Sequence, residues 1–186
     1  MRVKECRFLL GARRRAEFPR PNLPEIAFLG RSNVGKSSLI NALTGSDIAR
    51  VSRTPGRTQQ ANFFSINDAV LFVDLPGYGY AKAPASVRAQ LLETIEEYLT
   101  AGRGTALAVL LVDSRHEPTA LDLTMNTWLT EHQVPVQVVS TKIDKLSGSK
   151  PGRAVAIHRR VLGRDIVIPF SSETGQGKRE LWETID

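Results

Sequence analysis

A glycine-rich segment near residue 30 carries the residue types that bind phosphate. Residues 30–37 read Gly-Arg-Ser-Asn-Val-Gly-Lys-Ser, and glycines at 30 and 35 let consecutive N–H groups converge on one anion. Lys36 would place a positive charge at the β- and γ-phosphates of a nucleotide, and the Ser37 hydroxyl would bind Mg²⁺. An ordinary glycine turn is the alternative. The apolar run before this segment and the helical pattern after it favour a phosphate-binding loop.

A second loop, which contains an aspartate and a glycine, follows the apolar run 70–73. It reads Asp74-Leu75-Pro76-Gly77. The Asp74 carboxylate can hold Mg²⁺ through water, and the Gly77 N–H can reach a γ-phosphate. A D-x-x-G turn is common by itself, so its position on a strand after the first loop supports the functional interpretation.

Two further loops predict recognition of guanine. Thr141-Lys142-Ile143-Asp144 follows the run 134–139, and Ser171-Ser172-Glu173 follows the run 166–170. The Asp144 carboxylate can accept two N–H bonds from guanine, whereas adenine offers no such donor pair. The aliphatic stem of Lys142 can lie over the base. A backbone N–H in 171–173 could bond guanine O6, although that segment alone would be an ordinary polar turn.

The polar segment 50–60 is predicted to be a loop that supplies a second hydroxyl to Mg²⁺. Thr58 is the first candidate and Thr54 the alternative. Such a loop is expected to order when γ-phosphate and Mg²⁺ are present.

The elements that would position these loops alternate along the chain. Strands are predicted at 25–29, 62–66, 70–73, 107–112, 134–139 and 166–170, and helices at 36–44, 85–100, 119–132, 153–162 and from about 178. Asn67-Asp68 suits a tight hairpin, so one strand should be antiparallel. The pattern predicts an α/β fold in three layers, with a mostly parallel six-stranded sheet and helices on both faces. Residues 1–24 form a basic extension with a weak edge-strand pattern at 3–10, and residues 25–186 form the domain.

Composition restricts the class of protein. The 186 residues are 41% hydrophobic and 24% charged, with one cysteine and no apolar run near the 20 residues that span a bilayer. We therefore expect a soluble, cytoplasmic monomer that binds neither membrane nor DNA. The net charge of +6 suggests RNA as an anionic partner, with a generally solvated basic surface as the alternative.

Taken together, these motifs resemble the EngB (YihA/YsxC) family of bacterial GTPases, within the TrmE-Era-EngA-EngB-septin-like P-loop GTPases. The resemblance rests on residues 30–38, on Thr54-Pro55-Gly56-Arg57-Thr58-Gln59, on the 74–81 run Asp-Leu-Pro-Gly-Tyr-Gly-Tyr-Ala, on 113–116 and on 141–144. It implies a GTP-hydrolysing switch that acts in assembly of the large (50S) ribosomal subunit and is needed for normal septation and cell division. A nucleotide-gated interaction module at the division site is the alternative. An ATP-using enzyme is disfavoured by 141–144.

The expected site residues follow from the motifs and the resemblance. Lys36, Thr58, Gly77 and Asn33 are expected to be catalytic, and Ser37, Thr58 and Asp74 (through water) to hold Mg²⁺. GTP or GDP is expected to contact Gly30, Arg31, Ser32, Asn33, Val34, Gly35, Lys36, Ser37, Ser38, Gly56, Arg57, Thr58, Gln59, Gln60, Asp74, Leu75, Pro76, Gly77, Thr141, Lys142, Ile143, Asp144, Ser171, Ser172 and Glu173.

Three residues depart from the pattern of other GTPases. Tyr78 stands where Ras-like proteins have a glutamine that orients water, so intrinsic hydrolysis should be slow. Asn33 matches an asparagine that coordinates K⁺ in related GTPases, although it also suits a tight turn; K⁺ there would neutralise charge between the phosphates. Thr141 replaces a common asparagine, which should weaken bracing of the loops more than guanine choice.

Other side chains receive simpler expectations. Tyr78 and Tyr80 are predicted to be surface contacts, Trp128 and Trp182 to be core residues, and His116 a solvated loop residue. A basic cluster is expected to contact ribosomal RNA phosphates. Its proposed members are Lys145, Lys150, Arg153, Arg159, Arg160 and Arg164, and Arg13, Arg14 and Arg15 are candidate additions.

Overall fold

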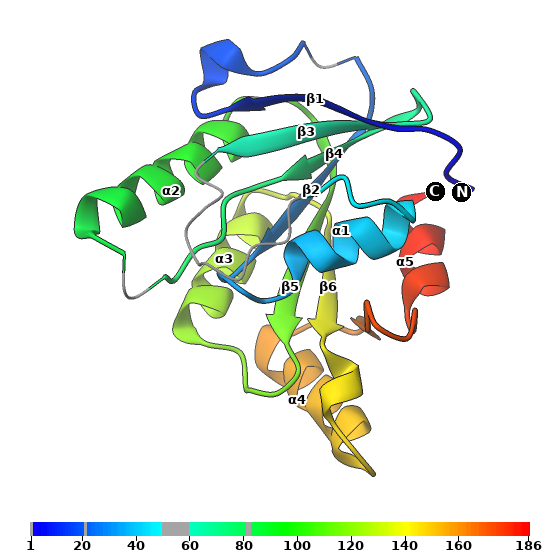
Figure 1. Ribbon diagram of the computed structural model, residues 1–186. Helices are drawn as coiled ribbons and strands as arrows, with labels where there is room; N and C mark the ends of the chain where they lie inside the picture. The colour runs from blue at the N-terminus through cyan, green and yellow to red at the C-terminus, as the bar shows by residue number, and fades with distance from the viewer. Residues whose placement is uncertain (1, 21, 50–59, 81–82) are drawn as a thin grey trace.

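The computed structural model describes residues 2–20, 22–49, 60–80 and 83–186. A seven-stranded sheet in the order β1-β3-β4-β2-β5-β6-β7 forms the middle layer (Figure 1). Its strands are Cys6–Ala12, Glu25–Gly30, Ala61–Ile66, Val70–Asp74, Thr105–Asp113, Val136–Thr141 and Val167–Pro169 for β1 to β7. The helices are Lys36–Thr44, Ala85–Leu99, Ala120–Glu131, Lys150–Leu162 and Lys178–Ile185 for α1 to α5, with 3₁₀ turns at Arg15–Glu17 and Ile143–Lys145. The predicted α/β architecture is confirmed.

One strand, β3, runs against the others, as the hairpin signal predicted. It pairs antiparallel with β4, and the turn between them places Asn67 and Asp68 at φ 54° and 49°. Both φ values are positive, which asparagine and aspartate tolerate better than most residues. The sheet has seven strands rather than six because β1, from the N-terminal extension, pairs with the free edge of β3.

Two hydrophobic layers hold helices against the faces of the sheet. One layer joins α2, α3 and α4 to the sheet through residues such as Ile95, Leu129 and Leu162. The other joins α1 and α5 through residues such as Leu39 and Trp182. The parallel strands are continuous apolar runs because both of their faces are buried.

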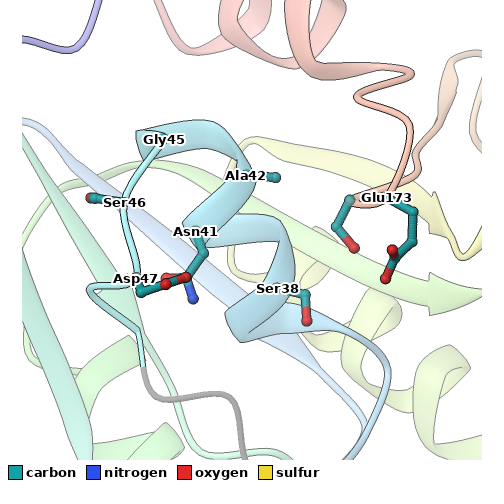
Figure 2. A pocket seen from close by; sticks show the side chains of 8 residues that line it. Ser38, Asn41, Ala42, Gly45, Ser46, Asp47 and Glu173 are labelled. Atoms are coloured by element: carbon teal, nitrogen blue, oxygen red, sulfur yellow. The ribbon is translucent and has the colours of Figure 1, made fainter.

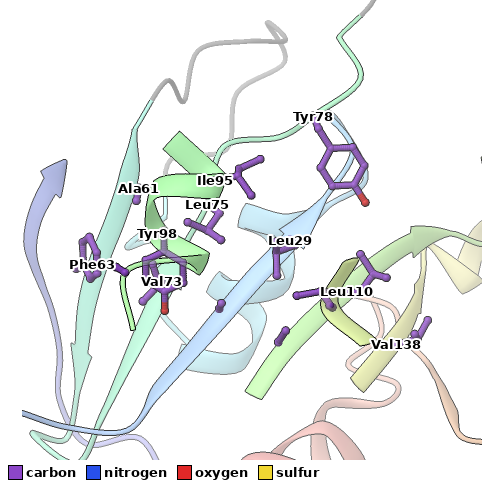
Figure 3. Packing of buried hydrophobic residues seen from close by; sticks show 14 of the residues in the cluster. Leu29, Ala61, Phe63, Val73, Leu75, Tyr78, Ile95, Tyr98, Leu110 and Val138 are labelled. Carbon is purple, nitrogen blue, oxygen red and sulfur yellow. The ribbon is translucent and has the colours of Figure 1, made fainter. Parts of the chain in front are cut away.

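Three expected packing positions were wrong. The apolar spacing of the predicted helices 85–100 and 119–132 puts Leu92 and Leu121 on their inner faces, but the two side chains are 50% and 45% exposed. Tyr78 was expected at the surface but is 3% exposed, and its ring belongs to the buried layer under α2 and α3 (Figure 3). Trp182 is buried as predicted, and Trp128 is half-buried against the same layer as Tyr78.

A buried ion pair anchors the start of β2. Glu25 is fully buried, and its carboxylate accepts hydrogen bonds from Arg103 Nε and the Tyr98 hydroxyl, both at 2.9 Å. The Arg103 guanidinium also lies over the rings of Phe18 and Phe63. This cluster fixes the end of β2 opposite the loop at 30–37. Among the described residues, no helix has the length and apolar character needed to cross a bilayer.

Candidate functional site

The loop after β2 turns directly into α1, and its geometry suits an anion. Asn33 and Gly35 adopt positive φ of 64° and 103°, which turns the chain between strand and helix. Helix α1 begins after Gly35 with no side-chain cap. Its first N–H groups, at Lys36, Ser37 and Ser38, have no acceptor within the helix and point out of its positive end. Such a terminus is a ready binding site for phosphate.

A cation and a carboxylate meet beside this terminus. Lys36 Nζ pairs with Asp74 Oδ1 at the end of β4, and both side chains are more than nine-tenths buried. The pairing offsets the cost of burying either charge alone. Because Lys36 begins α1 and Asp74 ends the strand next to β2, the two sequence motifs are brought together as predicted.

The Asp74–Gly77 loop lies against the loop at 30–37. A Cβ added to Gly77 would lie 3.0 Å from Ser32 Cα, so a larger residue here would require the facing backbone to shift. Ser32 N donates to Tyr78 O at 2.8 Å, and Tyr78 N donates to Gly30 O at 3.3 Å. Gly77 is therefore held beside the phosphate-binding loop by the backbone of its neighbour.

The side chain of Tyr78 is buried and contacts α3. Its hydroxyl donates to Asp122 Oδ1 in α3 at 3.1 Å, and burial together with the Asp122 charge raises the pKa of Tyr78 well above its usual value. The other Asp122 oxygen accepts from the N–H and hydroxyl of Thr119, which caps α3. Sequence reasoning missed Asp122, although the Thr119-x-x-Asp122 capping pattern was present.

Thr141 and Lys142 brace the phosphate-binding loop from β6. The Thr141 hydroxyl is 2.7 Å from Val34 O, so it replaces the bracing that an asparagine amide would give. Lys142 Nζ donates to Asn33 O at 2.6 Å and to Asp113 Oδ2 at 2.9 Å. Sequence reasoning assigned Lys142 only to the base plane and did not predict that its ammonium ties three loops together.

Asp113 supplies the carboxylate that pairs with the Lys142 ammonium. Burial opposes its ionisation, but hydrogen bonds from Arg115 and Lys142 outweigh burial and hold the pKa of Asp113 well below its usual value. The carboxylate is therefore charged at any pH near neutrality, and the anchor of Lys142 persists there.

Asp144 and Ser171 meet at the predicted base-binding edge. Ser171 Oγ donates to Asp144 Oδ1 at 2.7 Å, and Lys145 lies 3.0 Å from Oδ2. Burial raises the pKa of Asp144, but these two partners lower it by more, so the net shift is downward. The carboxylate is thus an acceptor for N–H groups at neutral pH.

The 171–173 loop leaves one backbone donor available within the described structure. Ser171 N donates to Gln176 O, and Glu173 N donates to Ser171 Oγ. Ser172 N has no acceptor among the described residues. Of the three residues predicted to supply a donor for O6, Ser172 is therefore the one whose N–H has no protein partner among the described residues.

A cavity of about 420 Å³ lies between α1 and this loop. Ser38 and Asn41 line it from α1, and Glu173 lies across from them (Figure 2). Ser172 also lines the cavity. The rest of its lining, Ala42, Gly45, Ser46 and Asp47, follows α1 to its C-terminal end, and Asp144 is not among the lining residues.

The donor set fits Mg²⁺ only in company with phosphate. Within the described ranges, no group of three or more His, Cys, Asp or Glu residues could hold a metal by itself. One hydroxyl, Ser37, and one carboxylate, Asp74, suit a hard cation that keeps several waters and shares phosphate oxygens. Gly56, Arg57, Thr58 and Gln59, with the alternative Thr54, lie outside the described residues, and Gln60 is half-buried just before β3.

Comparison with known proteins gives the family. Residues 25–142 match the family model described as 50S ribosome-binding GTPase. The probable GTP-binding protein EngB of Pelotomaculum thermopropionicum is 45% identical over the whole of this chain and 96% of its own length. Its counterpart in Geobacter metallireducens is 45% identical over the whole chain and 93% of its own length. The chain belongs to the EngB family of GTP-binding proteins.

Solved structures agree with this assignment. The crystal structure of a probable GTP-binding protein EngB superposes with a TM-score of 0.75 at 26% identity, covering 87% of this chain and 96% of that one. Aquifex aeolicus Era bound to GDP and AlF₄⁻ superposes with a TM-score of 0.72 at 24% identity, covering 88% and 56%, which shows a shared fold. As an EngB-family protein, the chain binds guanine nucleotide and carries a GTPase domain.

Proposed function

We propose that this protein is a slow GTP-hydrolysing switch acting in assembly of the large ribosomal subunit, and needed for normal septation and cell division. The uncapped start of α1, with Lys36 and Asp74 buried beside it, is the observation that carries the hydrolytic part. The match to a model described as 50S ribosome-binding supports the ribosomal part.

The nucleotide would lie along the C-terminal ends of the parallel strands. The phosphates would take the first N–H groups of α1 and the Lys36 ammonium, which must then leave its present partner Asp74. Asp144 would accept two N–H bonds from guanine, and Ser172 N–H would donate to O6. Bound Mg²⁺, held by Ser37 and by Asp74 through water, would neutralise charge on the β- and γ-phosphates.

Slow hydrolysis follows from where Tyr78 points. Its hydroxyl is engaged by Asp122 and is buried, so it cannot orient a water at the γ-phosphate. The Gly77 N–H would remain to contact the γ-phosphate. Positioning of the water must then come from Thr58, from a partner or from a cation.

Asn33 is the residue through which we propose that K⁺ acts. Its side chain is exposed beside the α1 terminus, while its carbonyl is held by Lys142. K⁺ coordinated there would neutralise charge developing between the phosphates. The GTPase rate should rise in K⁺ over Na⁺ at fixed ionic strength, and should lose that rise in Asn33→Ala. Equal rates in the two salts would refute the idea.

The ribosomal role is tested by co-sedimentation. The protein should sediment with large-subunit precursor particles in the presence of a GTP analogue and less so with GDP. A division-site interaction module would instead show no nucleotide-dependent sedimentation with these particles. Contact with RNA phosphates would use exposed residues of α4, chiefly Lys150, Arg153 and Arg160.

The basic cluster is smaller than the sequence indicated. Arg164 is half-buried and donates to Asn126 Oδ1 at 2.9 Å and Thr130 Oγ1 at 2.7 Å, so it serves the fold. Residues 13–15 follow β1 at the opposite edge of the sheet from α4, and Figure 1 places the two segments at opposite ends of the molecule. They do not join one surface.

A further inference from the structure

Asp113, the last residue of β5, is a charged residue beside the nucleotide site that is not among the expected site residues. In the register of the parallel strands β5 and β6 it pairs with Thr141, so it lies next to Lys142, which directly follows β6. Ser114 N donates to Thr141 O at 3.0 Å and fixes the chain just after Asp113. Strand pairing therefore brings the Asp113 carboxylate to the Lys142 ammonium, 2.9 Å away.

Lys142 has a backbone conformation that lysine seldom adopts. Its φ is 58°, and Asn33, whose carbonyl accepts from Lys142 Nζ at 2.6 Å, has a φ of 64°. Positive φ is costly for residues other than glycine, so it persists where contacts elsewhere hold the chain. A Cβ added to Gly35 would lie 3.8 Å from Lys142 Cε, so the lysine stem runs along the phosphate-binding loop. The contacts of the ammonium hold the far end of that stem.

Arg115 in turn fixes the Asp113 carboxylate. The Arg115 backbone N and Nε donate to Oδ1 at 3.1 and 2.9 Å. Nη2 donates at 2.8 Å to Oδ2, the oxygen that also accepts from Lys142. A contact through two guanidinium nitrogens sets the orientation of a carboxylate as well as its position. The Asp113 side chain is 15% exposed and that of Arg115 is 44% exposed, so the chain of contacts runs from the surface to the phosphate-binding loop.

We propose that Asp113, held in place by Arg115, is a positioning residue that sets the affinity for guanine nucleotide through Lys142. The stem of Lys142 is expected to lie over the base, and its ammonium holds the phosphate-binding loop through Asn33 O. Without Asp113, both the stem and the loop would have to be ordered when the nucleotide binds, and that ordering weakens binding. The inference rests on the nucleotide placement in the proposed function and not on the ribosomal role.

The dissociation rate of fluorescently labelled GDP from the full-length protein, measured by displacement with excess unlabelled GDP, tests this role. Asp113→Ala should raise the rate at least about tenfold, the effect of losing one hydrogen bond to a charged group. Asp113→Asn keeps an acceptor oxygen without the charge, so its rate should lie between those of the alanine variant and the wild type. Arg115→Gln should raise the rate about two- to fivefold, as for a partly exposed ion pair. The matched control Arg179→Gln removes an exposed arginine of α5 that pairs with Glu183 at 3.6 Å, and should leave the rate unchanged.

A double-mutant cycle separates positioning through Lys142 from a general loss of structure. Lys142→Met should itself speed dissociation. Adding Asp113→Ala to it should then change the rate by less than about twofold, because the lysine through which Asp113 acts is gone, whereas two independent losses of structure would multiply. The affinities for GDP and for a non-hydrolysable GTP analogue should fall by the same factor, since these contacts do not include Gly77, the residue expected at the γ-phosphate.

The outcomes that would overturn the inference differ from those that would overturn the proposed placement of the nucleotide. An unchanged rate in Asp113→Ala, or multiplied effects in the cycle, would overturn the inference alone. An unchanged rate in Lys142→Met would show that the nucleotide does not use Lys142, and would overturn the placement together with the inference. Urea unfolding of each variant without nucleotide verifies that it folds. If Asp113→Ala does not fold, Asp113→Asn and Arg115→Gln decide the question by the same rates.

Discussion

Replacing Asp144 by asparagine should change the preferred nucleotide from GTP to XTP. In the structure Ser171 Oγ donates to Asp144 Oδ1, while Oδ2 faces Lys145. The Ser171 hydroxyl would keep the amide oxygen of the new side chain in the Oδ1 position. The amide nitrogen would then occupy the Oδ2 position and present N–H groups towards the base.

The magnitude follows from the two bonds that Asp144 is proposed to accept from guanine. A hydrogen bond to a charged group contributes about 1.5–3 kcal/mol. Losing both bonds costs about 3–6 kcal/mol, and since 1.4 kcal/mol is tenfold, GTP affinity should fall roughly 10²- to 10⁴-fold. Xanthine carries a carbonyl where guanine has its exocyclic amine, so it can accept from the new amide, and XTP affinity should rise.

Titration calorimetry of the wild type and of Asp144→Asn, each with GTP and with XTP, measures this change in nucleotide preference. Lys145→Gln is the control, because it removes the neighbouring charge but leaves the carboxylate. The pH profile gives an independent readout. Because the pKa of Asp144 is lowered, its wild-type contribution is present above the ordinary aspartate value of about 3.9 and is lost only as pH falls below it. GTP affinity of Asp144→Asn equal to that of the wild type would refute the assignment of this residue to guanine.

Three further outcomes follow from the packing. Arg103→Met leaves the buried Glu25 carboxylate uncompensated and should lower the free energy of unfolding in urea by about 3–5 kcal/mol, with partial recovery when Glu25→Gln is added. Tyr78→Phe leaves Asp122 Oδ1 without its donor and should cost about 1–3 kcal/mol of stability, yet leave the rate of GTP hydrolysis within about twofold; a rate fallen a hundredfold would show that the hydroxyl is catalytic. Thr141→Val removes the brace on the phosphate-binding loop and should weaken GTP binding measured by calorimetry, whereas Thr141→Asn should retain it.

The order of elements was predictable because most strands are buried on both faces. Continuous apolar runs such as Ala106–Val112 leave few alternatives to a buried strand, and glycines or prolines mark where the neighbouring helices and strands end. Strand β1 was only weakly indicated for a physical reason. Phe8 and Leu9 are both exposed, and an irregularity between Phe8 and Leu10 shifts its register against β3, so the two-residue alternation is lost.

The site was predictable where a short motif carries its own geometry, and not where distant residues decide. Gly35 and Lys36 position themselves through one turn between strand and helix. The direction of the Tyr78 ring depends on Asp122, which is 44 residues later. Flanking glycines suggested a surface position, but the hydrophobic layer under α2 and α3 had room for the ring, and burying an aromatic ring outweighs a local turn preference. The pairing of Asp113 with Lys142 was not predicted for the same reason, since Lys142 follows another strand.

The net charge of the sequence does not show where in the fold the basic residues lie. A net charge of +6 suggests one basic face, yet residues 25–144 and 165–186 together hold 12 Lys or Arg against 17 Asp or Glu. The positive charge is confined to the N-terminal extension and to 145–164, which lie at opposite edges of a seven-stranded sheet. Six strand spacings separate those edges by roughly 29 Å. A single compact anion cannot contact both. Any RNA that uses both basic segments must therefore span the sheet, while RNA bound only at α4 should be indifferent to changes at residues 13–15.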